Sequence, residues 1–238
     1  MAAERLMRML STLTPSLDRL LEGGFPTGCL SLVYGEAETG KTTLTIQCAV
    51  SASREHLKTL YVDSDQSLSH HRLLQIVGAG NTDVCDDIII FLPQSFLEQS
   101  QIVESLENYI TRKVGLIVID TVTSLYRASF EGGKPFDLNR ELNRQLAYLA
   151  ELAARHHLTV VITGQVRSTV DGVGWKIEPV ARRTLFHWPK VVLRLKSTAK
   201  RSIKEARLER PLSDDPDERH CLLEMDKRGL VDFLYQPE

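Results

Sequence analysis

The residues with the clearest chemical pattern form the loop YGEAETGKTTL, in which Gly35 to Thr42 fit the spacing G-x-x-x-x-G-K-[ST]. In a loop of this kind, successive backbone N–H groups point inward and cradle phosphate groups. The amino group of Lys41 reaches the β- and γ-phosphate oxygens, and the hydroxyl of Thr42 binds Mg²⁺. We therefore predict that a nucleoside triphosphate binds at Gly35, Glu36, Ala37, Glu38, Thr39, Gly40, Lys41, Thr42 and Thr43.

Carboxylates follow two apolar runs elsewhere in the chain. GLIVID ends in Asp120, and an acid at this place helps to hold Mg²⁺, usually through water. TLYVDSD ends in Asp63 and Asp65, and a carboxylate there can orient a water molecule in line with the γ-phosphate. We assign the water to Asp65 and a structural, capping role to Asp63.

The segment ITGQVRSTVDG places Gln165 just past an apolar run and ahead of a polar, glycine-containing loop. The amide of Gln165 can contact the γ-phosphate and report its presence to that loop. A glutamine at such a position is also commonly an ordinary loop residue. The residues alone leave both interpretations open.

The elements that must position these side chains are indicated by the hydrophobic pattern. Unbroken Val/Ile/Leu runs of strand length are typical of a parallel sheet buried on both faces. They occur at residues 29–34, 59–63, 87–92, 115–120 and 158–163. Segments with helical character lie between them, at residues 42–55, 67–77, 98–112 and 137–156. This alternation predicts an α/β fold with a mostly parallel central sheet flanked by helices.

The last predicted helix and the region after it mark the end of this alternation. Pro135 precedes the helix and Asp137 can cap it. After Pro189, short strands are expected at residues 190–195, 205–210, 221–226 and 230–235, with a turn at 213–217. We interpret them as a C-terminal antiparallel extension of the sheet. The whole chain, 1–238, is predicted to be one domain, with residues 1–10 as a short N-terminal segment.

Composition narrows the class of protein. The chain has 238 residues, of which 42% are hydrophobic and 25% are charged, as is ordinary for a globular domain. No apolar run approaches the roughly 18 residues that a membrane span needs, and the N-terminus lacks the apolar core of a signal peptide. We expect a cytoplasmic protein without membrane contact. The four separated cysteines and the adjacent histidine pairs indicate neither a disulfide framework nor a metal site.

The net charge of −2 conceals a basic block. Residues 175–210 contain 11 Lys/Arg and three Asp/Glu, whereas the remainder contains 18 Lys/Arg and 28 Asp/Glu. A basic block in an otherwise acidic protein favours a polyanionic partner, with nucleic acid as the first choice. A solvated basic face is the alternative.

The run from Leu116 to Gly172 resembles the ATPase core of the RecA/RadA strand-exchange recombinases. Its acidic strand end, the SLYR stretch, the long helix and the QV…DG loop occur in the order found in that family. The segment from Ser11 into the phosphate loop is similar to the same family. The resemblance is closest to archaeal paralogues that lack the N-terminal helix-hairpin-helix domain, and we expect no such domain here. It implies a RecA-like P-loop NTPase core with ATP and Mg²⁺ as cofactors.

The resemblance also assigns roles to single residues. It makes Lys41, Asp65 and Gln165 the catalytic residues, with Asp65 at the place of the family's catalytic glutamate and Gln165 as the γ-phosphate sensor. Thr42 and Asp120 are the implied metal-binding residues.

Two assignments concern the ligands beyond the phosphates. Arg72 matches the arginine that packs on the adenine ring. Gln165 leads into a first DNA-binding loop at 166–174, and a second would lie within 175–188. The candidate DNA contacts are Arg167, Arg182, Arg183 and Lys190. Phe186 and Trp188 are possible base-stacking partners, although Trp188 and Pro189 could equally open a core strand.

Three departures from the family pattern carry expectations. Asp65 replaces glutamate and is about one methylene shorter, which predicts weak ATP hydrolysis. Ala181 and Arg182 replace the glycine pair of the second loop, which exchanges backbone freedom for charge and favours binding to the phosphate backbone. No Phe-x-x-Ala polymerisation segment is present, so a long filament is not expected, although self-association remains possible.

Together these observations favour a weak, DNA-dependent ATPase that acts in recombination and repair. It would bind DNA without sequence preference, single strands favoured, and assist a main recombinase of the RadA type while associated with the nucleoid. One alternative is a KaiC-like regulatory ATPase that exchanges protein partners without contacting DNA. A stand-alone recombinase is a third possibility.

Overall fold

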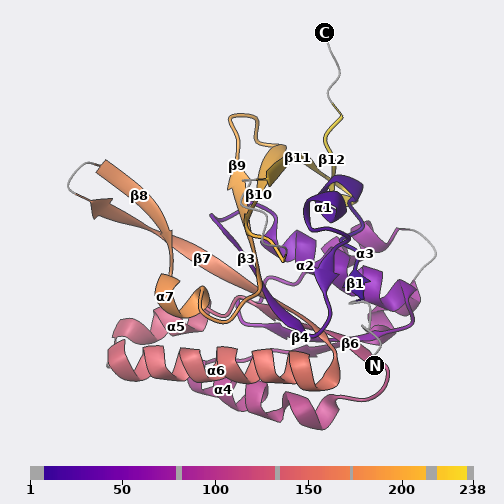
Figure 1. The fold of residues 1–238 in the computed structure, drawn as a ribbon. Helices are drawn as coiled ribbons and strands as arrows, with labels where there is room; N and C mark the ends of the chain where they lie inside the picture. The colour runs from indigo at the N-terminus through magenta and orange to yellow at the C-terminus, as the bar shows by residue number, and fades with distance from the viewer. Residues whose placement is uncertain (1–7, 79–81, 132–134, 172–173, 213–218, 235–238) are drawn as a thin grey trace, which may run out of the picture.

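A large mixed sheet forms the centre of the protein in a computed structural model that describes residues 8–78, 82–131, 135–171, 174–212 and 219–234. Within these residues the strand order is β12-β11-β10-β9-β3-β7-β6-β4-β5, and β8 pairs with β7 beyond the edge of the main sheet (Figure 1). The predicted fold class is confirmed.

The parallel part of the sheet carries the functional edge. Its strands are β3 (Cys29–Gly35), β4 (Lys58–Asp63), β5 (Ile88–Phe91), β6 (Val114–Asp120), β7 (Thr159–Asp171) and β9 (Val191–Ser197). Strand β3 is central and pairs in parallel with both β7 and β9. Because all these strands point the same way, their carboxyl ends form one edge where the polar residues gather.

The antiparallel extension is joined to the parallel part of the sheet through β9. Strands β10 (Ile203–Arg210), β11 (Arg219–Asp226) and β12 (Gly229–Asp232) form an antiparallel meander. Strand β9 pairs antiparallel with β10, as expected of the extension, and on its other side it pairs in parallel with β3. Local sequence gives a strand's length but not its direction, which depends on the partner. The turn expected at 213–217 lies outside the described residues.

Helices cover both faces of the sheet (Figure 1). One face is packed by α1 (Pro15–Leu20), α2 (Lys41–Arg54) and α3 (His70–Val77), and the other by α4 (Phe96–Ser105), α5 (Ser124–Ala128), α6 (Pro135–His156) and α7 (Arg182–Leu185). Short 3₁₀ turns span Thr82–Asp87, Leu106–Tyr109 and Ser129–Glu131. Both faces therefore bury apolar side chains, which explains the unbroken hydrophobic runs.

Helix boundaries differ from the prediction at several ends. Helix α6 begins at Pro135, so Asp137 lies in its first turn instead of capping it; proline is well tolerated there because first-turn N–H groups have no partner within the helix. The segment expected to be helical to residue 112 leaves the α-helix at Ser105. Helix α3 begins after Ser69, whose hydroxyl accepts from the backbone N–H of Arg72.

Two small features were not anticipated. Strands β1 (Met9–Leu10) and β2 (Phe25–Pro26) form a separate two-stranded sheet. Strand β7 continues past the main sheet to Asp171 and pairs with β8 (Gly174–Pro179) as an antiparallel ribbon that projects from the body (Figure 1). The first loop predicted at 166–174 is thus mostly strand, and within the second, 175–188, β8 is followed by helix α7; Gly172 and Val173 lie outside the described residues.

Candidate functional site

The phosphate loop connects the carboxyl end of β3 to the start of α2, as predicted. Glycine is required at both of its ends. A Cβ added at Gly35 would lie 2.2 Å from the backbone oxygen of Leu195. Gly40 has φ +100° and caps α2 in the left-handed conformation, which costs glycine little. The loop thus begins against strand β9 and ends with the N–H groups of α2 directed at a potential anion.

The amino group of Lys41 is folded into this loop. It donates to the backbone oxygens of Gly35 at 3.0 Å and Glu36 at 2.6 Å, and the residue is only 8% exposed. Burial lowers the pKa of Lys41, while the nearby carboxylates of Asp120, Asp65 and Glu36 act in the opposite direction. The cation is therefore held in a partly desolvated pocket, where its attraction to a phosphate is stronger than in water.

Asp120 lies at the end of β6, fully buried, and is held by hydroxyl groups. Tyr61 donates to its carboxylate at 3.1 Å, and Thr163 donates a further short hydrogen bond. Burial raises the pKa of Asp120, and hydrogen bonds from Thr163, Thr42 and Tyr61 oppose that shift.

The donor set around Thr42 fits a hard cation. The Thr42 hydroxyl lies 3.4 Å from the Ser67 hydroxyl and interacts with Asp120. These groups present only oxygen atoms, the ligands that Mg²⁺ prefers, and Mg²⁺ commonly keeps several waters beside one or two carboxylates. Thr42 and Asp120 are suitably placed to hold it.

Asp65 and Gln165, a hundred residues apart, are brought together at the same edge. The Gln165 amide donates to the Asp65 carboxylate at 3.4 Å, and its oxygen accepts from Arg127 at 2.9 Å. The backbone N–H of Gln165 donates to the Thr123 hydroxyl at 2.9 Å. The three side chains form a chain of polar contacts beside the phosphate loop.

Asp63 has the structural role that we assigned, although it caps a loop and not the helix. Its carboxylate accepts from the backbone N–H groups of Ser67 at 3.0 Å and Leu68 at 2.9 Å. This fixes the segment that carries Asp65 and Ser67 past the phosphate loop.

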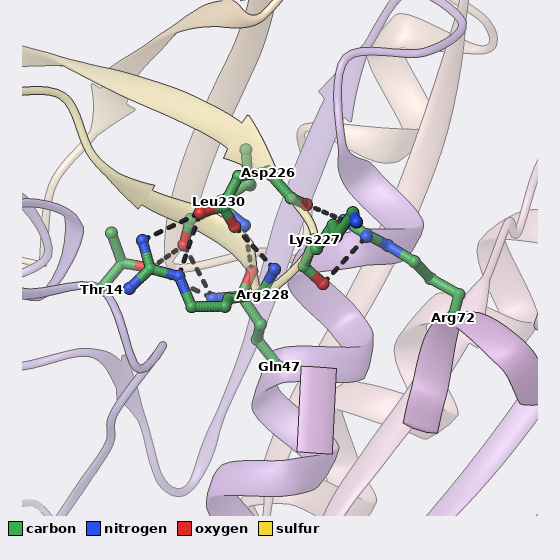
Figure 2. A network of polar contacts seen from close by, with 7 residues as sticks. All are labelled: Thr14, Gln47, Arg72, Asp226, Lys227, Arg228 and Leu230. Carbon is green, nitrogen blue, oxygen red and sulfur yellow. Dashed lines mark hydrogen bonds and ion pairs between the residues drawn. The ribbon is translucent and has the colours of Figure 1, made fainter. Parts of the chain in front are cut away.

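Arg72 extends from α3 to the turn between β11 and β12 (Figure 2). Its guanidinium donates to the backbone oxygens of Asp226 at 3.0 Å and Lys227 at 3.2 Å. Its predicted packing on adenine stays a prediction.

The candidate DNA contacts fall into two places. Arg182 and Arg183 are exposed on α7, which directly follows the β7–β8 ribbon that carries the exposed Arg167. Lys190 does not join them. Its backbone N–H donates to Leu30 at the start of β3, at the opposite edge of the sheet from the phosphate loop.

The two aromatic candidates are packed against the core. The Phe186 ring makes an edge contact with Tyr34 and lies under the guanidinium of Arg182 at 5.0 Å. The Trp188 indole donates to Asn143 on α6 at 3.0 Å. Both are only partly buried, and packing is the role that these contacts give them.

Three cations of the basic block are paired, hydrogen-bonded or buried inside the protein and are not open to a partner. Arg194 pairs with Glu209, Arg210 donates to the backbone oxygens of Phe186 and Pro189, and Lys204 is buried. The block is therefore not one open patch, and the solvated-face alternative fails for these three residues.

Sequence reasoning missed Arg127, Tyr61 and Thr163. Arg127 stands in the SLYR stretch that carried the resemblance, which was the one available signal for it. Tyr61 and Thr163 lie within apolar runs, where nothing local distinguishes a residue that contacts Asp120 from one that packs.

Other kinds of site find little support in the described residues. All four cysteines are unpaired there, and no three or more His, Cys, Asp or Glu side chains gather into a group that could hold a metal ion. No described helix is long and apolar enough to cross a membrane.

The chain is similar to known proteins along nearly its whole length. The family model for Rad51 matches residues 4–233. A DNA repair and recombination protein RadB from Methanosphaera stadtmanae is 30% identical over 91% of this chain and 93% of its own. The protein of the same name from Thermococcus kodakarensis is 37% identical over 85% and 90%. The crystal structure of the RadB recombinase superposes with a TM-score of 0.80 at 32% identity, covering 95% of this chain and all of that one.

Proposed function

The chain belongs to the Rad51 family, and on this premise we propose that it is an ATP-binding, DNA-binding accessory protein of homologous recombination and DNA repair. The observation that carries the proposal is the convergence of Lys41, Thr42, Asp120, Asp65 and Gln165 at one edge of the sheet. These residues come from the start of α2, the loop after β4, the last residue of β6 and the interior of β7, and they supply the parts that phosphoryl transfer to water requires.

Each part has a distinct task in the proposal. The loop N–H groups and Lys41 bind the phosphates, and Lys41 exchanges its bonds to Gly35 and Glu36 for bonds to phosphate oxygens. Thr42 and Asp120 hold Mg²⁺, which neutralises charge on the phosphate oxygens when bound. Asp65 orients the attacking water, and Gln165 contacts the γ-phosphate.

Hydrolysis is expected to be slow because Asp65 has a short side chain and is also engaged. Its carboxylate accepts from Gln165, which is itself held by Arg127. An aspartate that falls about 1 Å short of the water can lower the rate on the order of 10²-fold.

DNA binding is proposed for the ribbon and α7. The exposed cations Arg167, Arg182 and Arg183 follow one another along this part of the chain, so a phosphate backbone can contact them without base readout. The RadB relatives are named DNA repair and recombination proteins, which supports this choice of polyanion. We further propose that the chain assists a main recombinase of the RadA type and can self-associate.

The test is binding of fluorescent single-stranded DNA by the full chain, measured by anisotropy with and without ATP and Mg²⁺ across a range of salt concentrations. We expect binding whose logarithm falls with the logarithm of salt, with a similar response for unrelated sequences. Binding of ATP but not of DNA under any condition would instead support a regulatory ATPase. Strand exchange by the chain alone would make it a recombinase in its own right.

A further inference from the structure

Three parts of the chain that are far apart in sequence meet at the turn between β11 and β12 (Figure 2). Arg72 reaches the turn from α3, and Gln47 reaches it from α2. Thr14, just before α1, donates from its hydroxyl to the backbone oxygen of Leu230 at 2.7 Å. None of these contacts is needed to bind a phosphate, so the arrangement calls for another explanation.

The guanidinium of Arg72 is bonded along its edge. Its donors reach the backbone oxygens of Asp226 and Lys227, and also Gln75 on its own helix at 3.1 Å. Guanidinium N–H groups lie in the plane of the group, so acceptors at the edge fix the plane. The faces of the plane are the surfaces on which a flat aromatic ring stacks.

The turn that supplies these acceptors is itself fixed by Gln47. This side chain is 2% exposed, accepts from the backbone N–H of Leu230 at 2.9 Å and donates to its oxygen at 2.9 Å. Gly229 has φ +119°, and a Cβ added there would lie 2.7 Å from the Gln47 oxygen. The end of the hairpin formed by β11 and β12 therefore lies directly against α2, the helix that follows the phosphate loop.

The hairpin also borders the phosphate loop. A Cβ added at Gly40, the last glycine of the loop, would lie 2.7 Å from Met225 and 3.2 Å from Leu230. On the side of α3, the Ser67 hydroxyl lies 3.4 Å from that of Thr42. Arg72 and the turn thus lie beside the loop on the side of Gly40 and Thr42.

We propose that Gln47 and the turn 226–229 are positioning elements for the nucleobase, because they hold the guanidinium plane of Arg72 in the orientation in which a purine stacks on it. The inference rests on the proposed binding of ATP and deepens it. Selectivity for a base-bearing triphosphate is then set jointly by the helix that binds the phosphates and by a hairpin from the other end of the chain.

The test compares binding of Mg²⁺-ATP and Mg²⁺-tripolyphosphate to the full chain by calorimetry. Tripolyphosphate carries no base, so the dissociation constant of tripolyphosphate divided by that of ATP isolates the contribution of the base, and a smaller ratio means a smaller contribution. For Arg72→Lys and Gln47→Leu we expect ATP binding to weaken roughly 3- to 30-fold, because neither variant presents a fixed, planar guanidinium on which the base can stack. Binding of tripolyphosphate should change less than about 2-fold, which is under 0.5 kcal/mol, because this ligand has no base to contact Arg72.

A second substitution loosens the turn from its exposed side, should Gln47→Leu fail to fold. The Asp226 carboxylate accepts from the backbone N–H of Arg228 at 2.6 Å, so Asp226→Ala frees the turn without opening the core. The matched control is Arg201→Ala, which removes another arginine beside the loop, one that donates to Glu38 and is 89% exposed. Its ratio should equal that of the wild type.

The outcomes separate the inference from the proposed function. A reduced ratio in the Arg72, Gln47 and Asp226 variants, with an unchanged control, supports the inference. A ratio that falls for Arg72→Lys alone overturns the positioning role of the turn, and a ratio unchanged in every variant overturns the whole inference while ATP binding stands. Failure of the wild type to bind either ligand would overturn the proposed function itself.

Discussion

The two halves of strand β7 lie in contrasting surroundings. Residues 159–165 are flanked by β3 and β6, and Val160, Val161 and Ile162 are fully buried. Within the described part of the chain, residues 166–171 pair with β8 alone, in the ribbon that projects from the body. Gln165 stands at the boundary. One continuous strand thus carries a rigid half, which ends in the nucleotide site, and an exposed arm beside the candidate DNA contacts.

This contrast shows what each kind of chemistry requires. Carboxylates and a lysine that act on a triphosphate must be held within fractions of an ångström, which needs buried partners such as Tyr61 and Thr163 for Asp120. Contacts to a phosphate backbone need charge and access, which an exposed ribbon and the short helix α7 supply. Substitutions in the two halves should therefore differ in kind as well as in size.

The largest effect is expected in the phosphate loop, which follows β3, the neighbour of the buried half of β7. Lys41→Ala should weaken ATP binding by about 10²-fold or more, since it removes a charge-assisted contact from a partly desolvated site. Calorimetry with Mg²⁺-ATP measures it, and Lys113→Ala, an exposed lysine far from the loop, should bind as the wild type does. Equal affinities for the two variants would show that the loop does not use Lys41.

A gain of activity is expected at Asp65. Asp65→Glu should raise kcat, by up to about 10²-fold, because the added methylene brings the carboxylate closer to the attacking water. Phosphate release under saturating ATP reports the change, and KM should move less than kcat. No rise, with folding intact, would mean that slow hydrolysis has another cause, such as the hydrogen bond to Gln165.

A smaller effect is expected on α7. Arg182→Ala with Arg183→Ala should weaken single-stranded DNA binding by about 10-fold and reduce the salt slope by about 1.4, as for two lost contacts at roughly 0.7 each. Arg112→Ala with Lys113→Ala removes the same charge elsewhere on the surface and serves as the control. Similar losses in both double variants would indicate that only net charge matters.

The smallest effect is expected on stability in the arm. Ile177 on β8 is 38% exposed, so Ile177→Ala should lower the free energy of unfolding by less than about 1 kcal/mol. Ile162→Ala, in the buried half of β7, should cost about 2–5 kcal/mol because it leaves a cavity. Urea denaturation measures both. A comparable loss at both positions would show that the arm packs against something in solution.

The nucleotide edge could largely be predicted because its signals are local. The loop spacing, the apolar strand before it and the helix after it lie within some 25 residues, and α2 begins and ends within one residue of the expected positions. The acids at strand ends follow from the same logic. The part that Arg127 plays could not be derived, because its partner Gln165 lies 38 residues away.

The part of β7 that lies in the ribbon was predicted to be a loop, and the reason is physical. QVRSTVDG is polar and contains glycine, and both properties indicate a loop when a strand is expected to face a core. Here the strand is held by pairing with β8, in register from Val166 with Pro179 to Asp171 with Gly174. Such pairing leaves little trace in a single segment. The parallel pairing of β9 with β3 was missed likewise, because it depends on a strand that is far away in the sequence.

The bond between Gln47 and Leu230 has a consequence for the order in which the protein can be made. It joins residues 183 positions apart, and Tyr34, next to the phosphate loop, bonds to Glu209, 175 positions later. On a ribosome the phosphate loop emerges early, yet strand β3 gains its neighbours β7 and β9 only after most of the chain has been synthesised. Contacts of such long range form slowly. The nascent phosphate loop therefore lacks the strands on both sides of β3 until synthesis has passed residue 197.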